Sequence, residues 1–209
     1  MKKMFRLFTI AALAFGMTMA VGCGKPDDDE NGGNGGNGGN DNGPAILLEE
    51  NFDNGIPAEW NNIDADGDGV MWVLGSDIAG GPVGYNSTEC AASQSYINNE
   101  GPLTPDNYLV TPVLDFAGEY TLTWKVCAQD ASYPEDHYQV LVGTVENGVF
   151  KQTAKVYEET LAAAKAQGAW LSRSVSLKDY KGKKLAIAFR HCECTDAFWM
   201  NIDEVKVAK

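Results

Sequence analysis

Apolar and polar residues alternate in many short segments of this chain, and this feature most narrows its choice of fold. The alternation is clearest in residues 119–127, 137–143, 184–191 and 198–207. Because successive side chains of a strand point to opposite faces, a period of two is typical of half-buried strands. Clusters of Gly, Pro, Asn and Asp separate these segments, so we expect an all-β protein folded as a β-sandwich. Only residues 158–167 (EETLAAAKAQ) favour a helix, which we expect as an excursion between strands.

The first 22 residues are typical of a secretory leader. Lys2, Lys3 and Arg6 precede an apolar run, residues 7–21, that is too short to span a membrane comfortably. The run ends in Ala-Val-Gly-Cys, which resembles a bacterial lipobox and implies that Cys23 is lipidated and becomes the new N-terminus. We therefore expect residues 1–22 to be a lipoprotein signal peptide and Cys23 to hold the chain in outer-membrane lipid. Ordinary cleavage that leaves a free Cys23 is the alternative, and it suits an oxidising compartment poorly.

Residues 23–44 predict a disordered tether, because this Gly- and Asn-rich stretch has no large apolar group to bury. The acidic run KPDDDE at residues 25–30 resembles an export signal of Gram-negative lipoproteins, which implies that the protein faces the cell exterior. A solvated charge run that keeps the tether extended is the alternative.

Residues 45–209 are long enough for one domain with a substantial core. The formal net charge of the chain is −13 and becomes more negative when the basic leader is removed. Nucleic acid is therefore not an expected partner, because the domain has no basic patch that would release counterions.

The stretch IDADGDGVMW places three aspartates, Asp64, Asp66 and Asp68, at alternate positions before Gly69. This spacing matches the first half of an EF-hand loop, in which the backbone carbonyl of the seventh residue, here Val70, is also a ligand. The twelfth position holds Gly75 instead of a bidentate glutamate, so the loop must take its other ligands from elsewhere in the fold. We expect a calcium half-loop; a solvated acidic turn is the alternative.

A second group of oxygen ligands is spread over both ends of the domain. ENFDNG, residues 50–55, is expected to open the first strand, and NIDEV, residues 201–205, lies in the last. First and last strands of a sandwich are commonly neighbours, which would bring the Asn51 carbonyl and the Asp53 carboxylate toward Asp203 and Glu204. Hard oxygen ligands of this kind favour a second calcium ion. Surface charge at the ends of strands is the alternative.

Four cysteines follow Cys23, namely Cys90, Cys127, Cys192 and Cys194, and the sequence does not choose among their three full pairings. Cys192 and Cys194 are two residues apart, so on a regular strand they share a face and do not readily bridge. Buried thiols or one disulfide are expected. Zinc at residues 191–194 (HCEC) is a less favoured alternative, because the sequence shows no convergent fourth ligand.

No catalytic arrangement is evident in the sequence. Only His137 and His191 are available as imidazole bases, and no serine lies in a Gly-x-Ser-x-Gly elbow. We expect a binding protein and not an enzyme, either a surface adhesion module or a carbohydrate-binding or sugar-active sandwich. Exposed aromatic rings would favour the second class, and the candidates are Trp60, Trp72, Tyr85, Tyr96, Tyr133 and Trp199.

Several motifs carry a resemblance to a known family. ENFDNGIPAEWNNIDADGDGVMW, TPDNYLVTP, DHYQVLVG, AFRHCECTD and NIDEV occur here in the order seen in the cleaved adhesin domains of gingipains and related haemagglutinins. The resemblance covers residues 48–207. It implies a jelly-roll β-sandwich similar to carbohydrate-binding modules and MAM domains, with structural calcium.

Carried over by residue, the resemblance implies two calcium ions. The first ion would be held by Asp64, Asp66, Asp68 and the Val70 carbonyl, with help from carbonyls of the loop 80–86. The second would be held by Asn51, Asp53, Asp203 and Glu204, and Asn107 is an expected further ligand.

Two departures from the family pattern matter. Cys192 occupies a position that is usually aromatic, and this chain carries a single domain on its own lipobox instead of within a protease precursor. We therefore expect a surface-exposed lipoprotein with a calcium-stabilised adhesin module that binds a host or matrix protein or a glycan.

Overall fold

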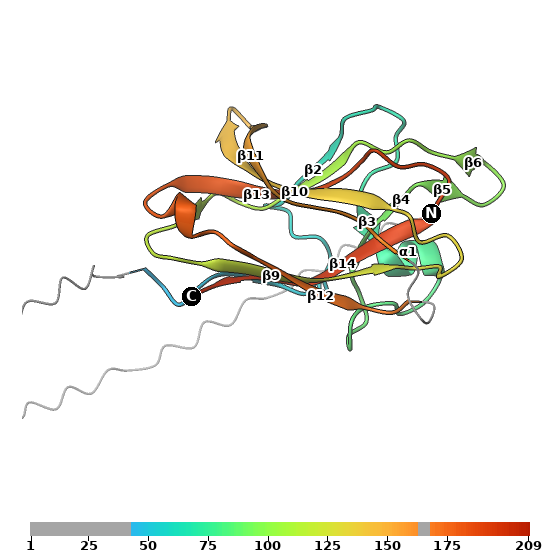
Figure 1. Ribbon diagram of the computed structural model, residues 1–209. Coiled ribbons are helices and arrows are strands. Elements are labelled where there is room, and N and C mark those ends of the chain that lie inside the picture. Colours follow the sequence, from blue (N-terminus) through green and yellow to red (C-terminus); the bar gives the residue numbers. More distant parts are fainter. Residues whose placement is uncertain (1–42, 163–167) are drawn as a thin grey trace, which may run out of the picture. The chain divides into compact units, whose positions relative to one another are not determined.

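The computed structural model describes residues 43–162 and 168–209, which form two antiparallel sheets packed face to face (Figure 1). The predicted signal peptide, lipidation site and tether up to residue 42 lie outside the described residues. The first sheet has the order β12-β9-β14-β4-β3, and β1 also pairs with β14. Its strands are β1 (Ile46–Glu50), β3 (Val73–Leu74), β4 (Ala91–Gln94), β9 (Thr121–Ala128), β12 (Leu171–Ser176) and β14 (Trp199–Ala208).

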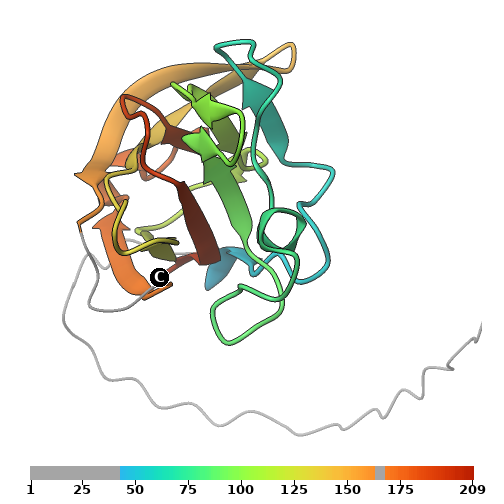
Figure 2. The ribbon, with the colours of Figure 1, turned by 90° about the vertical axis from the view of Figure 1, so that its right-hand side faces the viewer.

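The second sheet has the order β11-β10-β13-β7-β2, and β8 also pairs with β13. Its strands are β2 (Asn61–Asp64), β7 (Asn107–Val110), β8 (Leu114–Asp115), β10 (His137–Glu146), β11 (Val149–Thr160) and β13 (Lys184–His191). A small hairpin of β5 (Tyr96–Ile97) and β6 (Gly101–Pro102), one short helix α1 (Gly75–Ala79) and a 3-10 turn (Lys178–Tyr180) complete the described elements. The all-β jelly-roll sandwich expected from the sequence is confirmed, and Figure 2 shows its two sheets enclosing the interior.

The core lies between the sheets and is built by the inward-facing residues of the alternating segments. Trp124 of β9 crosses from one sheet to the other, with ring centroids 5.0 Å from Tyr157 and 5.8 Å from Phe189. Its indole Nε1–H donates to the Tyr138 hydroxyl at 3.1 Å. Trp124, Tyr138 and Phe189 are each at most 1% exposed, so the predicted period of two corresponds to real burial.

The first and last strands are neighbours, as predicted. β1 runs antiparallel to β14, and Glu50 lies opposite Val205. The segment 50–55 does not open the first strand, however, because β1 ends at Glu50 and residues 51–55 form the turn that follows. A bulge in β14 between Asp203 and Lys206 interrupts its pairing with β9 at the same level.

The helix expected at residues 158–167 is wrong for the five of its residues that the structure describes, 158–162, none of which is helical. Glu158, Glu159 and Thr160 end β11 and pair with His137–Gln139 of β10. Glu159 accepts hydrogen bonds from Arg173 of β12 and Tyr138 of β10, so partners in other strands outweigh the local helix propensity. Residues 163–167 lie outside the described part of the chain. Within the described ranges, no helix has the length and apolar character needed to cross a membrane.

Candidate calcium sites and ligand pocket

The three aspartates of the predicted half-loop converge at the end of β2. One carboxylate oxygen from each of Asp64, Asp66 and Asp68 lies within 4.8 Å of the other two. The two carboxylate oxygens of Asp64 accept the N–H groups of Gly67 at 2.7 Å and of Gly69 at 2.8 Å. These glycines have φ of 77° and 86°, a left-handed conformation that a side chain would strain, so the sequence D-x-D-G-D-G suits this turn.

Electrostatics within this loop are unfavourable when no cation is present. Burial, the hydrogen bond with Asp64 and the charge of Asp68 together raise the pKa of Asp66 above its usual range. The Gly69 N–H, the hydrogen bond with Asp66 and the Gly67 N–H hold the pKa of Asp64 below its usual range. The pKa values of Asp64 and Asp66 are thus shifted in opposite directions by their contact with each other and with this turn. Val70 closes the turn by donating its N–H to Asp68 at 2.7 Å. These carboxylate oxygens are the kind of ligand that a hard cation such as calcium prefers.

The second predicted site begins where β1 ends. Phe52 is fully buried with φ of 60°, and its N–H donates to the Glu50 carboxylate at 2.6 Å. This buried ring fixes the turn, so that Asn51 and Asp53 on either side of it lie at the surface. The Asp53 carboxylate accepts the Thr88 N–H at 3.0 Å, which is the main reason that its pKa is below the usual range.

Asp203 and Glu204 occupy the bulge in β14. Asp203 is fully buried, and its carboxylate accepts the N–H groups of Tyr85 at 2.7 Å and Glu204 at 2.6 Å. Burial nevertheless raises the pKa of Asp203 to about 6, against these two hydrogen bonds. Glu204 has φ of 48°, which is strained for a residue with a side chain and is seen mainly where the surrounding structure demands it.

The residues of this second set are linked through one loop, but among the described residues the carboxylates of Asp53, Asp203 and Glu204 do not converge within 4.8 Å as the three aspartates of the first set do. Asp203 accepts hydrogen bonds from Tyr85 and Ser87, and Asp53 accepts them from Thr88 and Glu89, so a single loop joins both carboxylates. Asn51 and Glu204 line one hollow together with Glu50 and neighbouring residues. Within the loop 80–86, the Tyr85 N–H contacts Asp203 of the second set, and help from carbonyls of this loop at the first site stays a prediction.

Asn107 lies opposite Asp64 in the pairing of β2 with β7. Its side chain is buried and donates to the Ser93 hydroxyl at 3.3 Å, and its Oδ1 has no hydrogen-bond partner among the described residues. The Trp72 indole donates to the Asn107 carbonyl at 3.1 Å. Asn107 therefore lies beside the first residue of the aspartate loop, and its side-chain oxygen Oδ1 is available as a ligand.

A pocket lies at the loops between β9 and β10 and between β13 and β14, beside the β5–β6 hairpin. Its lining residues are Tyr96, Asn98, Asp130, Tyr133, Asp196, Ala197 and Phe198. Tyr133 is 60% exposed, and Tyr96 and Phe198 are half-buried. Two of the six candidate aromatics thus line this pocket. Trp60, Trp72 and Trp199 are largely buried, although Trp199 lines a neighbouring pocket. Tyr85 packs edge-on against Trp170.

The sequence did not identify Asp130, Asp196 or Phe198 as pocket residues. Asp130 belongs to the β9–β10 loop, whereas Asp196 and Phe198 belong to the β13–β14 loop, and only the fold brings these two loops together. All four cysteines of the described part of the chain have free thiols, which agrees with the expectation of buried thiols. Burial raises the pKa of Cys127 to about 11 and that of Cys192 to about 12, so these thiols are not reactive at neutral pH.

Comparisons with known proteins agree with the motifs. Residues 45–207 match the family model of the Cleaved Adhesin Domain. Hemagglutinin A of Porphyromonas gingivalis (strain ATCC BAA-308 / W83) is 44% identical over 176 residues, which cover 78% of this chain and 8% of that protein. Lys-gingipain W83 of Porphyromonas gingivalis is also 44% identical over 176 residues, covering 78% of this chain and 10% of that protein. The chain thus spans a tenth or less of the length of these relatives.

Two solved structures share both fold and sequence with the chain. The K1 cleaved adhesin domain of Lys-gingipain from Porphyromonas gingivalis W83 has a TM-score of 0.68 at 43% identity, covering 77% of this chain and 96% of that domain. The K3 domain of the same protein has a TM-score of 0.66 at 43% identity, covering 78% of this chain and 97% of that domain.

The family is a non-catalytic adhesin domain, although its relatives here include proteases, so the expectation that this chain is not an enzyme is confirmed. The resemblance inferred from the five quoted motifs is confirmed as well. On the family model, the sequence identity and the shared fold, this chain belongs to the cleaved adhesin domain family.

Proposed function

We propose that this chain is a lipid-anchored surface adhesin, in which calcium stabilises the domain and loops at one end bind a host or partner macromolecule. The observation that carries the proposal is a pocket with an exposed ring in a domain of an adhesin family. Loops on a rigid sandwich are the usual place for binding residues. Asp64, Asp66, Asp68 and Val70 would hold one ion, and Asn51, Asp53, Asp203 and Glu204 would hold the second. When bound, the ions would neutralise clustered carboxylates and fix the turns.

Carbohydrate binding is the second candidate, and the composition of the same pocket favours it. Tyr96, Tyr133 and Phe198 offer ring faces, while Asp130 and Asp196 offer hydrogen-bond acceptors for hydroxyl groups. Pockets that combine apolar rings with a few polar groups are typical of small-ligand sites. Glycans are therefore included among the ligands to be tested.

We expect purified protein to bind a subset of spots on an array of glycans and extracellular-matrix proteins. Tyr133→Ala should weaken this binding about tenfold or more, because truncation of an aromatic hot-spot residue costs about 2 kcal/mol or more. Val149→Ala, an exposed apolar residue on β11 outside the pocket, is the matched control and should bind normally. Binding that survives Tyr133→Ala would place the ligand elsewhere, and binding to glycans alone would select the second candidate.

We expect Cys23→Ser to release the protein from the membrane fraction, because the lipid on this residue is the proposed anchor. Fractionation followed by immunoblotting measures the change, with Cys127→Ser, a buried thiol of the domain, as the control. Added protease tests the orientation: if intact cells shield the domain while lysed cells do not, the proposed exterior position is wrong.

A further inference from the structure

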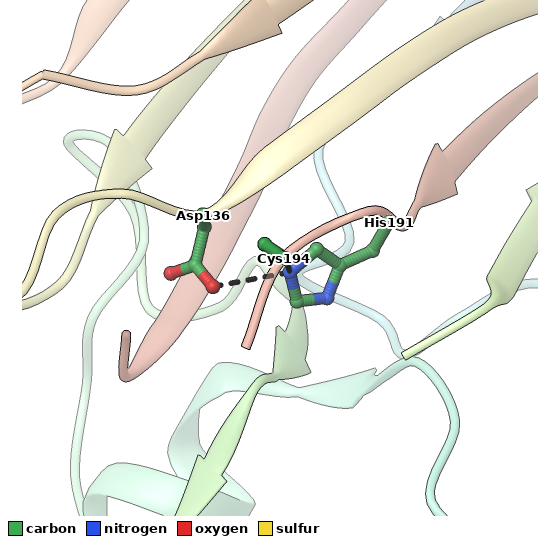
Figure 3. A group of neighbouring side chains, drawn as sticks. All are labelled: Asp136, His191 and Cys194. Carbon is green, nitrogen blue, oxygen red and sulfur yellow. Dashed lines mark hydrogen bonds and ion pairs between the residues drawn. The ribbon is translucent and has the colours of Figure 1, made fainter. Parts of the chain in front are cut away.

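Three potential metal ligands of different chemistry meet inside the domain, apart from both sets of calcium residues. They are Asp136, which precedes β10, His191, the last residue of β13, and Cys194 in the loop that follows. Figure 3 shows the Asp136 carboxylate and the His191 ring pointing toward one another, with Cys194 beside the ring. Asp136 and His191 are fully buried, and Cys194 is the half-buried member of the group.

The Asp136 carboxylate and the Cys194 thiol both lie beside the same ring nitrogen of His191. His191 Nε2 lies 3.1 Å from Asp136 Oδ1 and 3.2 Å from Cys194 Sγ. In a tetrahedral zinc site with bonds of about 2.0–2.3 Å, neighbouring ligand atoms are about 3.3–3.5 Å apart. The two separations from Nε2 are within a few tenths of an ångström of this arrangement, and the ligand atoms of Asp136 and Cys194 lie within 4.8 Å of each other, so small side-chain movements would open the cluster around an ion.

This geometry excludes a cysteine–histidine–aspartate nucleophile. In such a triad the base faces the nucleophile with one ring nitrogen and the carboxylate with the other. Here both groups face Nε2, while Nδ1 contacts the Ser93 hydroxyl at 2.8 Å. Burial also raises the pKa of the Cys194 thiol to about 12, so the free thiol is not a nucleophile at neutral pH.

A buried ion pair of His191 with Asp136 leaves one carboxylate oxygen unexplained. Asp136 Oδ1 accepts the Ser95 hydroxyl at 2.6 Å and also faces His191, whereas Oδ2 is buried with no hydrogen-bond partner among the described residues. A buried acceptor without a partner destabilises the folded state. Asp136 Oδ2 therefore needs a partner that the described side chains do not supply.

We propose that Asp136, His191 and Cys194 form a zinc site. A thiolate, an imidazole and a carboxylate are typical zinc ligands, and the sulfur disfavours calcium. Metal binding deprotonates a coordinating thiol, so the two anionic ligands balance the charge of the ion. The Ser93 hydroxyl at Nδ1 orients the ring with Nε2 toward the cluster, as expected of an outer partner of a metal-bound histidine.

The loop around Cys194 is held in a conformation that suits this role. Glu193 and Asp196, on either side of it, both have φ of 56°, a strained left-handed conformation that persists only where surrounding contacts demand it. An ion bound to Asp136 and Cys194 would fasten the β9–β10 and β13–β14 loops, which carry Tyr133 and Phe198 of the pocket.

Cobalt provides the direct test, because a cobalt–thiolate bond gives a charge-transfer band in the near ultraviolet. The full chain with Cys23→Ser is titrated with Co²⁺ in millimolar calcium, which keeps the oxygen sites filled. We expect one equivalent of cobalt, a thiolate band, and displacement of the cobalt by Zn²⁺. Cys194→Ser should abolish the band, and Cys192→Ser, two residues away, should keep it.

Three results would overturn the proposal: no retained metal, cobalt bound without a thiolate band, or a band lost in Cys192→Ser but kept in Cys194→Ser. The second result would assign the cobalt to an oxygen–nitrogen group such as His137, Glu158 and Glu193. If Cys194→Ser does not fold, Ser93→Ala in the protein with the native Cys194 decides. Loss of the hydroxyl that orients His191 should weaken cobalt binding about tenfold or more, and an unchanged affinity refutes the site.

Discussion

Trp124→Ala is expected to lower the free energy of unfolding by about 3–5 kcal/mol. The indole is 1% exposed and contacts rings from three strands of the opposite sheet, so its removal leaves a cavity between the two layers. It also removes the donor to the Tyr138 hydroxyl. At about 2–4 °C per kcal/mol, the melting temperature should fall by roughly 6–20 °C.

Urea unfolding followed by circular dichroism measures this change. Trp170→Ala is the matched control, because Trp170 is only half-buried and its ring contact is with Tyr85 at 6.0 Å. We expect the control to cost less than half as much. Equal costs for the two substitutions would show that the sheets are not held together at Trp124.

The sequence alone was sufficient for the sandwich because its signal is local. Alternate residues such as Leu122, Trp124 and Val126 share a face whatever their partners are, and burial of that face is the main driving force for folding. The pairing of β1 with β14 was predicted because the first and last strands of a β-sandwich are commonly neighbours. The local argument failed at Glu158–Thr160, where a helix-favouring sequence pairs with β10 and Glu159 binds Arg173 of another strand.

The candidate sites also differ in whether their residues are close in the sequence or are brought together only by the fold. Asp64, Asp66 and Asp68 lie in one turn, so their convergence is visible in the spacing, and the structure places them together. Asp136 could not be assigned to His191 and Cys194 from the sequence, because 55 residues separate it from His191 and only the β10–β13 pairing brings them together. The pocket likewise depends on three separate loops.

Removal of calcium is expected to lower the melting temperature of the domain by roughly 5–11 °C. An ion that binds only the folded state stabilises it by about 2.7 kcal/mol when free calcium is a hundredfold above the dissociation constant. This converts at about 2–4 °C per kcal/mol. The half-loop lacks a bidentate glutamate, so we expect an affinity of about 10⁻⁴ to 10⁻³ M unless ligands from distant strands strengthen it.

The effect of calcium should depend on pH, because protons compete for the same carboxylates. Burial raises the pKa of Asp203 to about 6, so without calcium its proton stabilises the folded state at low pH, and this stabilisation is lost as pH rises from about 4 through 6. Calcium binds the ionised form. The difference in melting temperature with and without calcium should therefore be larger at pH 7.5 than at pH 5, and Asp203→Asn should reduce this dependence.

Melting curves of residues 45–209 in millimolar calcium and in excess chelator make the comparison. Asp66→Asn tests the first site, because the pKa of Asp66 is raised by burial and by its contact with Asp64, so its charge is the one most in need of a cation. Asp179→Asn, an acid in the 3-10 turn outside both sites, is the control and should keep the full response. If the curves with calcium and with chelator coincide, the three aspartates form a solvated acidic turn, and the adhesin domain of this chain is stable without an ion.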